Sequence, residues 1–121
     1  MDYQHLVLLW AGHYLADFSL QTRFMSEMKA RIFIEDIGIH ALTAHAFVHG
    51  LVIGLLAQNF AAGVAVGSTH WLIDFIRSSE YVQRVLIKRG ILKKKSDKLF
   101  GIHADQALHL LVIVIVVWSL S

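Results

Sequence analysis

Four long apolar stretches constrain the fold of this sequence more than any other feature. They cover residues 3–20, 37–57, 60–76 and 100–120, and each is near the ~17–25 residues that a helix needs to cross a bilayer. Hydrophobic residues make up 56% of the 121 positions, only 17% are charged, and the mean hydropathy is +0.57. A soluble domain this short cannot bury so much apolar surface. Proline is absent, which favours unbroken helices. The sequence therefore predicts an all-α membrane protein, one domain over residues 1–121, formed by a bundle of four transmembrane helices.

The basic residues predict how these helices are oriented. All 11 Lys and Arg lie in two segments: Arg23, Lys29 and Arg31 follow the first stretch, and the others lie in the loop 77–99 before the fourth. Because cytoplasmic loops carry the excess of Lys and Arg, we expect two cytoplasmic loops and both termini outside. Residues 1–4 lack the basic start of a signal peptide, so the first stretch is expected to be a retained span. The loop 77–99 is expected to contact anionic lipid headgroups, which explains the pI of about 9.1 without nucleic acid.

Each apolar stretch carries two residues of metal-ligand type, four positions apart. The pairs are His13 with Asp17, His45 with His49, His70 with Asp74, and Asp105 with His109. Residues at i and i+4 share one face of a helix, so each pair can point at one centre. The order is reversed in the fourth stretch, as antiparallel helices require if like groups are to lie at one depth. The spacing predicts a layered His and Asp site in the inner leaflet, to which all four helices contribute.

A metal ion is the preferred explanation of these eight residues. An ionised residue in the middle of a membrane costs ~2.5–3.5 kcal/mol, and an ion compensates carboxylates while neutral imidazoles ligate it. A set of Asp and His without Cys suits a divalent transition metal such as Zn, Fe or Mn. Eight ligands are too many for one tetrahedral ion, so we expect one or two ions. A proton or ion pathway and purely structural hydrogen bonding are the alternatives.

Other polar residues near the pairs are weaker candidates. They are His5, His40, His103, Gln21, Gln106, Lys29 and Arg77. The three histidines lie on other faces or at the outer end, and the two glutamines either support ligands or are surface groups. The two cations lie at the cytoplasmic mouth, where they could meet an anionic substrate. The preferred interpretation gives them only the ordinary role of positive charge at the inner membrane face.

Several segments resemble a known family. The segments LLWAGHYLADFSLQTRFMSEMK, AHAFVHGL, THWLIDFIR and DQALHLLV resemble the bacterial and phage membrane family called domain of unknown function 3307. The family pattern falls on His13, Asp17, Gln21, Met25, Lys29, His45, His49, His70, Asp74, Asp105, Gln106 and His109. This resemblance implies a place in the bacterial inner (cytoplasmic) membrane and no established function. A looser similarity to membrane-bound metal-dependent hydrolases implies hydrolysis by analogy.

Three functions stay open at this point. The first is a membrane-embedded metal-dependent hydrolase of a lipid or phosphate ester, with one Asp or His as general base. The second is a component of metal-ion or proton transport, for which four spans would require a homo-oligomer or a membrane partner. The third is a structural or accessory membrane subunit whose small bundle is held together by the metal.

Overall fold

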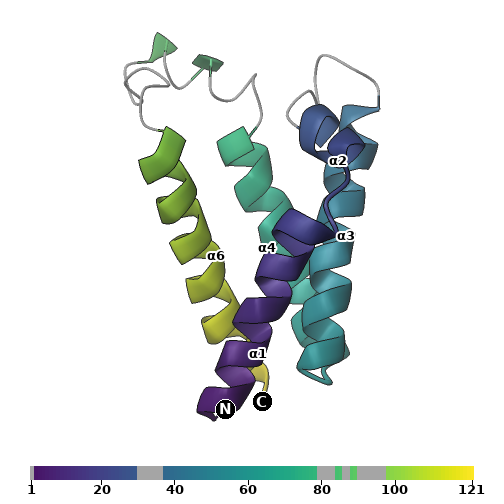
Figure 1. The fold of residues 1–121 in the computed structure, drawn as a ribbon, viewed down its shortest axis with the longest axis vertical. Helices are drawn as coiled ribbons and strands as arrows, with labels where there is room; N and C mark the ends of the chain where they lie inside the picture. The colour runs from purple at the N-terminus through teal and green to yellow at the C-terminus, as the bar shows by residue number, and fades with distance from the viewer. Residues whose placement is uncertain (1, 30–36, 79–83, 86–87, 90–97) are drawn as a thin grey trace.

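The computed structural model of this chain is all-helical over the residues that it describes, which are 2–29, 37–78, 84–85, 88–89 and 98–121 (Figure 1). Its helices are α1 (Tyr3–Tyr14), the π-helix η1 (Leu15–Ser19), α2 (Arg23–Met28), α3 (Gly38–Leu56), α4 (Phe60–Ser78) and α6 (Lys98–Leu120). The four predicted stretches coincide with α1 extended by η1, and with α3, α4 and α6. The prediction of an all-α fold is confirmed for this part of the chain.

One described helix, α3, is long and apolar enough to cross a membrane. The apolar parts of α4 and α6 are shorter, Phe60–Ile76 and Asp105–Leu120. The four-span bundle and its orientation therefore stay predictions. Most of the basic loop 77–99 lies outside the described residues.

The long helices run antiparallel to their neighbours, and both chain termini lie at one end of the molecule (Figure 1). At the opposite end lie α2, the C-terminal end of α4 and the N-terminal end of α6 (Figure 1). Helix α3 packs against α4 and α1, and α6 packs against α4 and α1. The segments that carry the basic residues are therefore connected to the end opposite the termini.

Helices α3 and α4 pack through glycines. A Cβ atom at Gly63 would lie 2.7 Å from the carbonyl oxygen of Gly50 and 2.9 Å from the Cα atom of Gly54. The two backbones thus approach more closely than any side chain would allow at these positions. The GxxxG motif of Gly63 and Gly67 lies in this helix contact, as small-residue motifs of membrane helices do.

A tight turn joins α3 to α4. Gln58 has a φ of 51°, in the left-handed region, and reverses the chain after the end of α3. The Oδ1 atom of Asn59 accepts a hydrogen bond of 3.1 Å from the N–H of Ala62, which caps α4. Its Nδ2 donates to the carbonyl of Leu120 at 3.0 Å. The turn is thereby tied to the C-terminal end of α6.

The interior has an apolar layer and a polar layer. The apolar core is formed by Leu9, Ile53, Ala62, Val66, Ile113 and Val117. In each long helix one of these residues lies four positions from a candidate histidine, as Leu9 does from His13, so the two layers share the same helix faces. The buried polar residues of the described chain are His13, His45, His49, His70, Asp74 and His109.

Large apolar side chains lie on the outer surface of the long helices. Phe47, Leu55, Phe60 and Trp118 have exposed fractions of 67%, 68%, 87% and 71%, and they are spread over α3, α4 and α6. A soluble protein has the reverse arrangement, with its ionisable residues outside and its large apolar side chains inside. Exposed apolar surface of this extent is typical of contact with a membrane or with another protein.

Candidate metal centre

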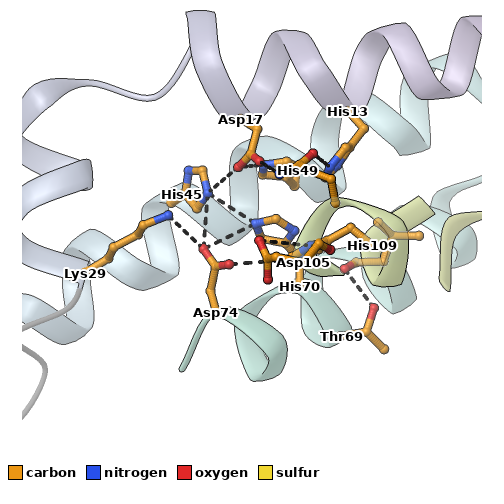
Figure 2. A network of polar contacts seen from close by, with 12 residues as sticks. His13, Asp17, Lys29, His45, His49, Thr69, His70, Asp74, Asp105 and His109 are labelled. Atoms are coloured by element: carbon orange, nitrogen blue, oxygen red, sulfur yellow. Dashed lines mark hydrogen bonds and ion pairs between the residues drawn. The ribbon is translucent and has the colours of Figure 1, made fainter. Parts of the chain in front are cut away.

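Asp17 lies in η1, where one turn of the first helix contains one residue more than a turn of α-helix. The N–H of Leu20 donates to the carbonyl of Leu15 at 2.8 Å, which is the i to i+5 hydrogen bond of a π-helix. The extra residue breaks the α-helical register that Asp17 would share with His13. The Asp17 carboxylate points towards α3, and His13 contacts a side chain of α6 (Figure 2).

Asp17 and three histidines form a compact group, called here the four-ligand group. The Oδ1 atom of Asp17 lies 3.3 Å from the Nε2 atoms of both His45 and His49. The Nε2 atom of His45 lies 3.2 Å from the Nε2 atom of His70. One ligand atom from each of the four residues lies within 4.8 Å of all the others. The three histidines are fully or almost fully buried, so the group is closed to solvent on most sides.

A second group shares His70 with the first. In this three-ligand group, the Oδ2 atom of Asp74 lies 3.5 Å from His70 Nε2, and its Oδ1 atom lies 3.7 Å from His109 Nε2. Asp74 Oδ2 is also 3.4 Å from the Nε2 atom of His45. The two groups are therefore adjacent parts of one cluster (Figure 2).

Gln106 of α6 links His13 to Asp17. Its amide nitrogen donates to Asp17 Oδ2 at 2.5 Å, and its carbonyl oxygen lies 2.9 Å from His13 Nε2. The Asp17 carboxylate only accepts hydrogen bonds, so the Gln106 NH2 group must face it. The Gln106 carbonyl oxygen then faces His13 Nε2, which must carry a proton and donate a hydrogen bond to that oxygen. The contact occupies Asp17 Oδ2 and leaves Oδ1 to face the histidines of α3. Gln106 is thus a support for Asp17, one of the two roles that its sequence position left open.

His109 is held by its own helix. Its Nδ1 atom donates to the carbonyl of Asp105 at 2.8 Å, one turn earlier, and lies 3.6 Å from the Asp105 carboxylate. This bond places the lone pair on Nε2, which is buried and has no hydrogen-bond partner among the described residues. A backbone or carboxylate acceptor on the far nitrogen is the usual orientation of a metal-ligating histidine.

Lys29 enters the cluster, and the preferred interpretation of this residue was wrong. Lys29 directly follows α2, its side chain is only 14% exposed, and its Nζ atom donates to Asp74 Oδ2 at 3.0 Å (Figure 2). It compensates a buried carboxylate and so does more than supply positive charge at a membrane face. The sequence places Lys29 in a loop, and only the folding of α2 against α3 brings it to α4.

The other candidates lie at varying distances from the cluster. His13 and Asp105 are outside both groups, although His13 stacks on His109 with ring centroids 5.3 Å apart. His40 is exposed on α3, and His5 lies in the first turns of α1, far along the helix from the cluster. The side chains of His103 and Arg77 lie outside the described residues.

The residues present fit a divalent metal ion. In a tetrahedral site with bonds of about 2.0–2.1 Å, two donor atoms are about 3.3–3.4 Å apart. The donor separations of 3.2 and 3.3 Å in the four-ligand group are close to this value. The Nε2 atom of His49 is buried without a hydrogen-bond partner in the described chain and faces Asp17. Its ring stacks on His70 with centroids 3.6 Å apart, which neutral imidazoles tolerate and two imidazolium charges would oppose.

Comparison with known proteins identifies a family without a function. The model of the family described as "Protein of unknown function (DUF3307)" matches residues 5–121, which confirms the resemblance seen in the sequence. No curated protein and no solved structure matches this chain. The similarity to membrane-bound metal-dependent hydrolases therefore stays a prediction.

Replacing Gln106 tests its link between His13 and Asp17. We expect Gln106→Met to lower the free energy of unfolding by about 1–3 kcal/mol, because a buried donor and a buried acceptor lose their partners. Denaturant unfolding followed by circular dichroism measures the difference.

Gln21 offers a matched control for this substitution. Its Oε1 atom is buried but has no hydrogen-bond partner in the described part of the chain. We expect Gln21→Met to leave the free energy of unfolding unchanged or to raise it. Equal losses in the two variants would show that the link through Gln106 contributes nothing of its own.

Proposed function

This chain belongs to the DUF3307 family, and we propose that it is an integral membrane protein that binds a divalent transition metal ion, Zn, Fe or Mn, in the four-ligand group. The observation that carries this proposal is the convergence of four donor atoms from three separate parts of the fold. Asp17 comes from η1, two histidines from α3 and His70 from α4. Three of their six separations are 3.2–3.3 Å, which suits a tetrahedral ion, and all six lie within 4.8 Å.

The closed character of the four-ligand group supports a structural role for the ion. Structural zinc sites use four protein ligands, whereas catalytic sites use three and keep one position for water or substrate. An ion held by all four residues would tie the first helix, α3 and α4 together. It would also offset the negative charge of Asp17, which is costly in a low-dielectric interior. This role corresponds to the metal-stapled membrane subunit.

The surface chemistry supports a place in the membrane. The exposed faces of α3, α4 and α6 carry large apolar side chains, while His45, His49, His70, Asp74 and His109 of these helices are buried. In the proposed orientation, the end of the molecule with α2 faces the cytoplasm. The metal cluster then lies in the inner leaflet of the bacterial inner membrane, beneath the basic segments.

Metal analysis is the direct test of the proposed site. Protein purified in mild detergent without chelators is expected to hold about one transition-metal ion per chain, since one group provides four ligands. The double variant Asp17→Asn, His49→Gln loses two of the four ligands and is expected to hold no metal ion. Inductively coupled plasma mass spectrometry measures both proteins, and the melting temperature of the wild type should fall when the metal is removed.

His40→Gln is the control for the loss of an imidazole from α3. Because His40 is exposed and lies outside both groups, this variant should keep its ion. The proposal fails if the wild type, folded and never chelated, contains no metal and its melting temperature does not respond to added metal.

The orientation can be tested with single cysteines, because the chain has none of its own. We expect Ser26→Cys, in α2, to react with a membrane-impermeant maleimide only from the cytoplasmic side, and Ser121→Cys to react only from outside. Labelling of intact and of permeabilised cells distinguishes the two sides. The reverse pattern would place the metal cluster in the outer leaflet.

Hydrolysis of a lipid or phosphate ester is a second candidate, favoured by the environment of His13. Its Nδ1 atom is buried and has no hydrogen-bond partner among the described residues, while its Nε2 atom donates to Gln106. A bound divalent ion would polarise a phosphoryl oxygen and activate water. His13 Nδ1 would then be available to accept a proton as general base.

This second candidate requires turnover that depends on both the metal and His13. The metal-loaded protein should release phosphate from vesicles that contain polyprenyl phosphate, or a water-soluble headgroup from vesicles of phospholipid, and His13→Gln should abolish the release while keeping the metal. Vesicles that release neither product with the wild-type protein would exclude hydrolysis of these esters and leave the structural role.

A further inference from the structure

The number of ions in the cluster is constrained by the residue that the two groups share. One imidazole nitrogen has one lone pair and binds one ion, and the contacts of His70 in both groups run through its Nε2 atom. If His70 binds an ion in the four-ligand group, the three-ligand group is left with Asp74 and His109 alone. Sites that hold a transition metal tightly have three or four protein ligands, so two protein ligands are too few.

The Asp74 carboxylate already has a cationic partner. Lys29 Nζ lies 3.0 Å from Asp74 Oδ2, closer than the nearest imidazole nitrogen, His45 Nε2 at 3.4 Å. The side chains of Lys29 and Asp74 are 14% and 4% exposed. An ammonium group held this closely in a nearly dry environment repels a divalent ion that approaches the same carboxylate.

The charges of the cluster lead to the same result. Asp17, Asp74 and Asp105, whose carboxylate lies 3.6 Å from His109 Nδ1, carry three negative charges, and Lys29 carries one positive charge. One divalent ion beside them brings the sum for these four side chains from −2 to 0, and a second would bring it to +2. Accumulated positive charge is as unfavourable in a buried site as unpaired negative charge.

We propose that Lys29 takes the place of a second metal ion, so that the cluster is a centre with one metal and one ammonium group. This inference rests on the proposed metal site in the four-ligand group. In this arrangement the ion lies among Asp17 and the histidines of α3 and α4. Lys29 fixes Asp74 and excludes a further ion from the three-ligand group. The end of α2 is therefore part of the metal centre, and its position determines the metal content.

The test is the metal content of a variant without this ammonium group. Lys29→Ala removes the positive charge that repels a divalent ion from the Asp74 carboxylate, whose Oδ1 atom faces His109. We expect the wild type to bind one Co²⁺ per chain and Lys29→Ala to bind a second, more weakly, through Asp74 and His109. Titration with Co²⁺, followed by its visible absorption and by elemental analysis, measures both stoichiometries. Adding Asp74→Asn to Lys29→Ala should return the stoichiometry to one.

Three further variants serve as controls. Lys29→Arg keeps the positive charge and should bind one ion, and Lys29→Gln should bind two if Lys29→Ala does not fold. Arg23→Met removes a positive charge from the same segment, where Arg23 pairs with Glu27 at the surface, and should leave the stoichiometry at one.

The outcomes separate this inference from the metal site itself. One ion in the wild type and one in both neutral variants of Lys29 overturns the inference and leaves the metal site intact. Two ions in the wild type also overturn it. No ion in any folded variant overturns the metal site, and the inference fails with it.

Discussion

The structure depends on the compensation of two carboxylates inside an otherwise apolar assembly of helices. Asp74 is 3% exposed, and Asp17 lies within 3.3 Å of two buried imidazoles. Neither group can be placed there without partners, because an isolated ion in such an environment costs many kcal/mol. The partners from other elements come from α3, from α6 and from Lys29, the residue after α2. The packing of the helices therefore brings partners to the buried carboxylates as well as burying the apolar core.

The same requirement explains two irregular features of the fold. The π-turn of η1 separates Asp17 from the register of His13, so that the carboxylate meets α3 while Gln106 of α6 bridges both residues. The fold of α2 back towards α3 brings the Lys29 ammonium group to Asp74. Both features give a buried carboxylate a donor that regular helices would not supply.

The helices and most of the candidate cluster could be predicted from the sequence, because the helices follow from the length of the apolar stretches and the cluster from the spacing of its residues. Apolar length identified the long helices, and the spacing of four residues identified the faces of His45 with His49 and of His70 with Asp74. The role of Lys29 could not be predicted, since a residue in a loop has no fixed direction until the loop folds. The contact of Asp17 with α3 and the link from His13 to Asp17 through Gln106 were also missed, because the i,i+4 argument assumes a regular α-helix and the sequence shows no π-turn.

The position of His45 bears on the choice between a resident ion and a transported one. Its Nε2 atom lies 3.3 Å from Asp17, 3.2 Å from His70 Nε2 and 3.4 Å from Asp74, so it borders both groups. An ion that crossed the cluster would pass from one group to the other beside this nitrogen. Lys29 holds Asp74 on one side of the cluster, so an ion that bound Asp74 during transport would have to displace the Lys29 ammonium group. Transport by way of Asp74 would therefore require Lys29 to move, whereas an ion held in the four-ligand group would not. The static contacts of Lys29 favour the resident ion.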